Sequence, residues 1–78
     1  MTAPAPLGNR LKELRARHNL TQAQLAEMVG VTRKTINTVE NRVFIPSALL
    51  ALKLAAALGV AVEEAFFLEP EEGEALQV

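Results

Sequence analysis

A row of polar side chains near the middle of the chain has the residue types that can read a DNA duplex. The segment after Thr32 is expected to be helical to about Asn41, with Ile36 and Val39 turned inward. The outward positions are then Arg33, Lys34, Asn37 and Thr38, with Thr35 on one flank. Arginine and lysine can address guanine, asparagine can address adenine, and a threonine methyl group can contact thymine. The row therefore indicates a base-reading helix, with an ordinary solvated helix face as the alternative.

Two short helices joined by a single-glycine turn must position that row. Thr21 and Gln24, three residues apart, form a capping box that predicts a helix beginning at Gln22. Gly30 ends this helix because glycine adopts positive φ without strain, and Thr32 caps the next one. This spacing is typical of a helix-turn-helix, whose second helix enters the major groove of DNA.

Small and apolar residues occupy the positions that such a unit packs. They are Leu25, Ala26, Val29, Gly30, Val31, Ile36 and Val39. We expect the first helix of the pair to bury Leu25, Ala26, Met28 and Val29. A tight corner inside another helical bundle would use similar residues, but it would not require the polar row.

The rest of the chain predicts further helices and an all-α fold. Helices are expected over residues 9–18, with Asn9 as N-cap, over residues 48–58, with Ser47 as N-cap, and over residues 62–68. Asn19 and Gly59 suit the ends of two of these helices. Five helices joined by short links make a domain of local contacts.

Charge is distributed unevenly along the chain. Residues 1–45 hold seven Lys or Arg against three Glu, whereas residues 46–78 hold one Lys against six Glu. Such asymmetry hints at contact with a polyanion, although charge also solvates a small protein. We expect a flexible arm over residues 1–8, a DNA-binding domain over residues 9–68 and an acidic tail over residues 69–78. The tail either aids solubility or binds a protein such as a toxin.

Several classes of protein are excluded by what the sequence lacks. It has no Cys, Asp, Tyr or Trp, no apolar run of the ~20 residues that a membrane span needs, and no secretory signal. The single histidine, His18, and the single serine, Ser47, make neither a metal cluster nor a nucleophile with its base. We expect a cytoplasmic protein that is not an enzyme, with no cofactor, metal or small-molecule ligand.

Two segments resemble the Cro/CI-type helix-turn-helix regulators, a family that includes phage repressors and many short bacterial transcription factors. The segments are NRLKELRARHNLTQAQLAEMVGVTRKTINTVENR and IPSALLALKLAAALGVAVEEAF, which together cover nearly all of residues 9–66. The resemblance implies a five-helix, lambda-repressor-like domain that acts as a homodimer on a pseudo-palindromic operator. The expected function is transcriptional regulation through sequence-specific binding of double-stranded DNA, most simply repression. The alternative is a protein-interaction module or an antitoxin component whose main role is to bind a partner.

The resemblance also assigns roles to individual residues. It implies base contacts by Arg33, Lys34, Asn37 and Thr38. It implies phosphate contacts at Gln22, where the free amide groups of a helix N-terminus suit an anion, and around the end of the next helix. The expected phosphate contacts are Thr21, Gln22, Thr35, Asn41, Arg42 and Arg10.

Two further positions follow from the same family pattern. An arginine of the first helix pairs in the family with a glutamate late in the third, which implies a structural salt bridge between Arg15 and Glu40. The family commonly has glycine after the asparagine that ends the third helix, but this chain has Arg42. A positive-φ stop there is expected to be strained at Arg42 or shifted onto Asn41.

Apolar side chains exceed what one small core can bury. Residues 48–58 carry a second apolar stripe at Leu49, Leu52 and Ala56, so this helix must be covered on two sides. We expect a twofold dimer through Phe67 and Leu68, or as second choice through Phe44, Ile45 and Leu49. The alternative is that these residues fold back onto their own core.

Overall fold

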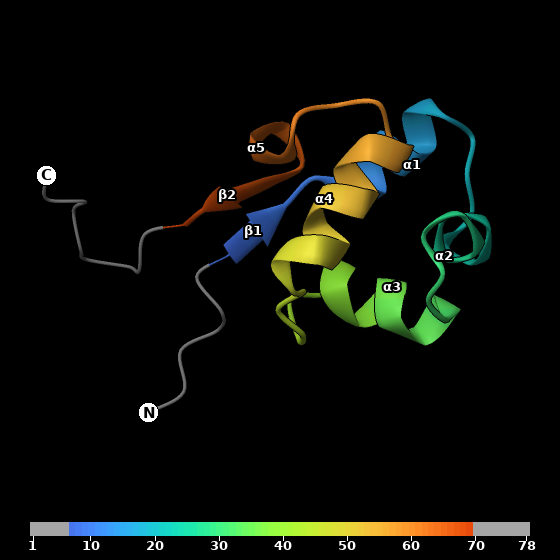
Figure 1. The fold of residues 1–78 in the computed structure, drawn as a ribbon, viewed down its shortest axis with the longest axis horizontal. Coiled ribbons are helices and arrows are strands. Elements are labelled where there is room, and N and C mark those ends of the chain that lie inside the picture. The colour runs from blue at the N-terminus through green and yellow to red at the C-terminus, as the bar shows by residue number, and fades with distance from the viewer. Residues whose placement is uncertain (1–6, 70–78) are drawn as a thin grey trace, which may run out of the picture.

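Short helices form most of residues 7–69, the part of the chain that the computed structural model describes. In chain order the elements are β1 (Leu7–Asn9), α1 (Leu11–Arg17), α2 (Gln22–Val29), α3 (Arg33–Glu40), α4 (Ala48–Ala57), α5 (Val62–Ala65) and β2 (Phe66–Leu68). Five helices are present between residues 7 and 69, as expected, and a small antiparallel sheet adds to them (Figure 1). The predicted five-helix, largely α-helical architecture is thus confirmed.

The small sheet corrects two expectations about the ends of the domain. β1 pairs with β2 in the register Leu7 with Leu68, Gly8 with Phe67 and Asn9 with Phe66. Leu7 and Gly8 therefore belong to a strand and not to a loose arm, and the last helix ends at Ala65 instead of continuing to Leu68. The remaining residues assigned to the arm and the tail, 1–6 and 70–78, lie outside the described part of the chain.

Asn9 was also expected to cap the first helix, but Arg10 occupies the N-cap position. The Asn9 side chain joins three elements instead: its Oδ1 accepts from the N–H of Leu11 at 3.1 Å, and its Nδ2 donates to the carbonyl of Val39 at 3.0 Å. The backbone N–H of Arg10 donates to the carbonyl of Ala65 at 2.9 Å. Long-range pairing thus supplies partners that a local cap would otherwise provide.

The ring of Phe67 packs over Gly8, its partner across the two strands, because Gly8 has no side chain. A Cβ atom there would lie 2.3 Å from Cε1 of Phe67, so the aromatic ring occupies that space. The guanidinium of Arg10 stands 4.6 Å from the centroid of the same ring. We call this group of Gly8, Arg10 and Phe67 the terminal clasp.

Hydrogen bonds confirm the predicted helix starts. Thr21 accepts from the N–H of Gln24 at 3.0 Å while the Gln24 side chain accepts from the N–H of Thr21 at 2.8 Å. Thr32 caps α3 and Ser47 caps α4 in the same way, through side-chain oxygens. α2, α3 and α4 therefore begin where their cap residues predict, whereas α1 and α5 have no side-chain cap.

Left-handed residues end the helices. Gly30, Gly59 and Asn19 have φ of 80°, 71° and 56°. The positive-φ residue after α3 was expected to be Arg42, with strain, or Asn41. The structure places it at Arg42, whose φ is 63°, while the φ of Asn41 is −88°. A non-glycine residue in this region costs free energy, which the surrounding contacts must offset.

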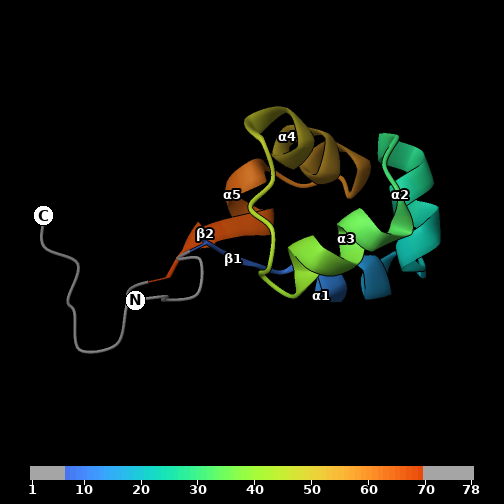
Figure 2. The ribbon, with the colours of Figure 1, turned by 90° about the horizontal axis from the view of Figure 1, so that it is seen from below.

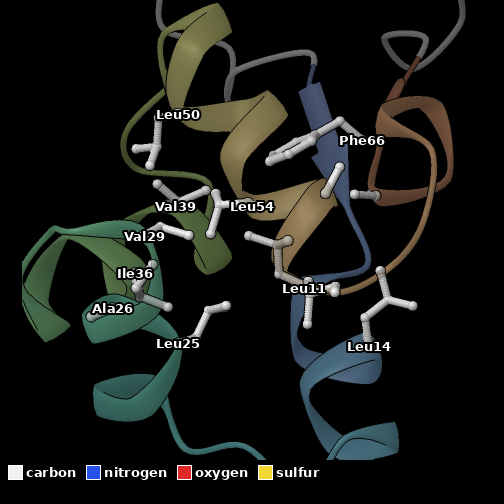
Figure 3. Close-up of a cluster of buried hydrophobic side chains, with 13 residues drawn as sticks. Leu11, Leu14, Leu25, Ala26, Val29, Ile36, Val39, Leu50, Leu54 and Phe66 are labelled. Carbon is white, nitrogen blue, oxygen red and sulfur yellow. The ribbon is translucent and has the colours of Figure 1, made fainter.

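The core lies where α1, α2, α3 and α4 meet, and Phe66 closes it beside β1 (Figure 3). Its largest fully buried side chains are Leu11, Leu25, Ile36, Leu54, Leu58 and Val39. Met28 was expected to be buried but is 54% exposed. The inward face of α2 is formed by Leu25, Ala26 and Val29, and helical geometry places Met28 to the side of that face. None of the helices in residues 7–69 has the length and apolar character needed to cross a membrane.

Candidate nucleic-acid interface

α3 lies along one edge of the molecule, and α2 packs beside it. Figure 1 shows α3 at the lower edge of the ribbon, and Figure 2, seen from below, shows it in front. Ile36 and Val39 attach α3 to the core and are fully buried. The opposite side of α3 carries the polar row. Arg33 and Lys34 are exposed, whereas Asn37 and Thr38 are half-buried.

The first residue of α2 is hydrogen-bonded to this row. Gln22 donates from Nε2 to Oδ1 of Asn37 at 3.2 Å, and its Oε1 accepts from the guanidinium of Arg33 at 3.1 Å. Asn41 donates to the same Asn37 oxygen at 3.2 Å. The structure therefore joins one expected phosphate contact, Gln22, to two expected base contacts. Sequence reasoning missed this link, since residues 22 and 37 come together only through the crossing of α2 and α3.

An ion pair beneath the row fixes α3 to α1. Nε of Arg15 is 2.6 Å from Oε2 of Glu40, and the Nη2 group donates to Oε1 at 3.1 Å. The side chains are only 14% and 5% exposed, and Arg15 also donates to the carbonyl of Leu20 at 2.9 Å. Gln22 donates a further bond to Glu40 at 3.0 Å. The ion pair thus supports the same network that holds the polar row.

The remaining expected phosphate contacts are spread over the surface. The Thr21 side chain caps α2. The hydroxyl oxygens of Thr35 and Thr32 are 3.1 Å apart and share a hydrogen bond. Arg10 is held in the terminal clasp and donates to the carbonyl of Glu64 at 3.2 Å. Arg42 forms an ion pair with Glu69 at 2.5 Å, beyond the end of β2. The two arginines are therefore engaged within the chain, while Gln22 and Asn41 adjoin the polar row.

The residues expected at a dimer surface divide into two groups. Phe67 is partly covered by its own chain in the terminal clasp, while Leu68 is 72% exposed. Ile45 and Leu49 lie at the start of α4 and are exposed, as is Leu52, one turn further along the helix. Phe44 lies instead in a hollow beside α3.

Comparison with known proteins identifies the class of this fold and site. Residues 11–64 match the helix-turn-helix family, and the chain belongs to that family in its Cro/CI-type form. Its members are DNA-binding transcription regulators and not enzymes. The expected resemblance is thereby confirmed.

Particular relatives cover most of the chain. An uncharacterized HTH-type transcriptional regulator of Bacillus subtilis, YgzD, is 48% identical over 63 residues, which are 81% of this chain and 96% of that protein. The restriction-modification controller protein C.AhdI of Aeromonas hydrophila is 37% identical with a TM-score of 0.66, covering 69% of this chain and 78% of its own. The P22 c2 repressor, solved in complex with a synthetic operator, is 30% identical with a TM-score of 0.67. The match covers 69% of this chain and 82% of the repressor chain.

Proposed function

We propose that this protein is a cytoplasmic repressor that binds a pseudo-palindromic operator as a homodimer, with α3 in the major groove. The observation that carries the proposal is the polar row of α3, which is held by hydrogen bonds from Gln22 and supported by the largely buried side chains of Arg15 and Glu40. A row whose side chains are fixed before binding loses less conformational entropy on contact with bases. The family of DNA-binding regulators to which the chain belongs supports the same reading.

Base recognition falls to Arg33, Lys34, Asn37 and Thr38. Arg33 and Lys34 are exposed donors for guanine. Asn37 receives hydrogen bonds on Oδ1 from Gln22 and Asn41, which orient its amide group toward a base edge. These assignments predict that binding depends on particular base pairs.

Phosphate recognition falls to Thr21, Gln22, Thr35 and Asn41, with weaker contributions from Arg10 and Arg42. Gln22 lies at the N-terminus of α2, where unpaired amide groups attract an anion. Arg10 and Arg42 keep their charge near this surface, but each already has a partner in the chain. Their contribution is expected to fall as salt rises.

A second copy of the chain is proposed to cover Ile45 and Leu49. Phe67 already packs on Gly8 and Arg10, which leaves Leu68 as the exposed residue of the first expected set. Ile45 and Leu49 are both exposed at the start of α4, and Leu52 extends the same apolar surface. A small core of this size gains stability from association. Sedimentation at micromolar concentration is expected to give a dimer, and a monomer that pairs only on DNA would refute a preformed interface.

Selection of bound duplexes from random DNA tests the proposal as a whole. We expect enrichment of two inverted half-sites whose centres are roughly 34–36 Å apart, one turn of the double helix. Affinity for the selected duplex is expected to fall steeply between about 50 and 200 mM salt. Recovery of no common sequence, with binding indifferent to salt, would instead favour a protein-interaction module.

A further inference from the structure

An apolar hollow lies beside the polar row of α3. It measures about 360 Å³ and is lined by Lys34, Thr35 and Thr38 from α3 and by Val43 and Phe44 from the following loop. Val43 is 76% exposed and Phe44 is 47% exposed. Figure 2 shows this loop leaving the end of α3 on the side that faces the viewer, so the loop and α3 lie on one face of the molecule.

The loop is fixed against the last turn of α3. The backbone N–H groups of Val43 and Phe44 both donate to the carbonyl of Thr38, at 2.9 and 3.2 Å. The Thr38 hydroxyl donates to the carbonyl of Thr35 at 2.9 Å. Arg42, which turns the chain with φ of 63°, is tied to Glu69. The backbone that carries the two apolar side chains is therefore held at a set position relative to the polar row.

The loop side of the hollow offers no donor to a phosphate group, whereas the donors Lys34, Thr35 and Thr38 all lie on its α3 side. Val43 and Phe44 have no side-chain donor, and their backbone donors are already bonded to Thr38. The major groove of DNA presents one apolar group, the C5-methyl of thymine. Lys34 and Thr38, two of the proposed base contacts, bound the hollow on its α3 side, so a base read by this end of α3 brings its edge there.

We propose that Val43 and Phe44 are specificity-determining residues that receive the methyl group of a thymine in each half-site. The inference rests on the proposed function, because it requires α3 to occupy the major groove. A hollow of this size admits the methyl group together with the edge of its base. The loop then contributes to the sequence preference of the protein.

Replacement of thymine by deoxyuridine tests this inference, since the change removes only the methyl group. Each thymine of a selected half-site is replaced in turn, and the affinity of the full chain for each duplex is measured. At one thymine position we expect a loss of about threefold to fivefold, which is the size expected for one buried methyl group. In Phe44→Ala and Val43→Ala the same replacement is expected to cost less than about twofold. Met28→Ala is the matched control, because Met28 is an exposed apolar residue on α2, and it is expected to keep the full loss.

Three results would overturn the inference. The first is a selected site in which every deoxyuridine is tolerated, and the second is a deoxyuridine penalty that persists unchanged in both loop variants. The third is uniform weakening of all duplexes by Phe44→Ala with no methyl dependence, which would indicate a sugar-backbone contact. In all three the protein still binds its site, so the proposed function survives. Failure to select any duplex would overturn the proposed function and this inference together.

Discussion

α3 and α4 rest on the same core, yet they present opposite chemistry to solvent. α3 buries Ile36 and Val39, and α4 buries Leu50, Leu54 and Ala55. The outer side of α3 carries arginine, lysine and asparagine. The outer side of α4 carries the exposed Leu49, Leu52, Lys53 and Ala56.

The difference shows that burial determines the fold of such a helix, while its outer side determines what it binds. A polar row that is already hydrogen-bonded to a neighbouring helix suits an ordered array of donors and acceptors, such as a base edge. An apolar row exposed on a small domain suits another protein surface. The same core therefore supports two interfaces of different chemistry, and each can be disrupted without the other.

The largest effect is expected from the ion pair that supports α3. Glu40→Ala leaves Arg15 without its carboxylate partner in a largely buried position, which is expected to cost about 3–5 kcal/mol of unfolding free energy. Urea unfolding measures the loss. Glu13→Ala is the control, because the Glu13 carboxylate also pairs with an arginine, Arg17, but both side chains are more than half exposed. The control is expected to cost less than about 1 kcal/mol, and equal losses in the two variants would contradict the supporting role of Glu40.

The next largest effect compares how the exposed sides of α3 and α4 contribute to operator affinity. Arg33→Ala is expected to weaken operator binding by about 1–3 kcal/mol, or roughly fivefold to 150-fold, and to relax the preference at one base pair. Lys53→Ala removes the same charge from the exposed side of α4 and is expected to change affinity by no more than about twofold. Fluorescence anisotropy on a selected duplex distinguishes the two. Comparable losses in both variants would mean that charge alone, and not the polar row, binds DNA.

Self-association tests the apolar side of the comparison. Leu49→Glu places a charge in the proposed dimer surface and is expected to weaken the dimer about tenfold or more, because truncations at the centre of an interface commonly cost above 1 kcal/mol. Lys12→Glu, at an exposed lysine of α1 outside that surface, is the control and is expected to leave the dimer unchanged. Sedimentation equilibrium is the measurement. If Leu68→Glu dissociates the dimer while Leu49→Glu does not, the interface lies at the end of β2 instead.

The smallest effect concerns Arg42, which lies between the two helices. Glu69→Gln removes the charge that pairs with this arginine and is expected to raise operator affinity about twofold at low salt, since phosphate no longer competes with a carboxylate. The gain should fade near 0.2 M salt. Glu63→Gln, an exposed glutamate of α5, is the control, and an unchanged affinity for Glu69→Gln would show that Arg42 does not reach the DNA.

Local signals predicted the helices well and the sheet not at all. Thr21, Thr32 and Ser47 each cap a helix by accepting a hydrogen bond from the backbone N–H three residues later. Such a bond depends only on neighbouring residues, so the sequence alone predicts it. The strands have three residues each, too few to display an alternating pattern, and they pair across almost the whole domain. The boundaries near Asn9 and Ala65 therefore depended on contacts that local patterns do not encode.

The site divides in the same way. Helical periodicity was enough to assign the outward row of α3, because Ile36 and Val39 fix which side faces the core. The bonds from Gln22 to Asn37 and Glu40 depend on how α2 crosses α3, so they could not be predicted. Arg10 was expected at a phosphate, but its place in the terminal clasp follows from the sheet.

The central claim is that the polar row of α3 contacts DNA, and amide chemical shifts test it most directly. The full chain labelled with nitrogen-15 is titrated with a selected duplex, and the shift of each backbone amide is followed. We expect the largest changes at Arg33, Lys34, Asn37 and Thr38 and at the start of α2, with little change along the exposed side of α4 beyond Leu49. Changes concentrated on α4, with α3 unaffected, would contradict the account.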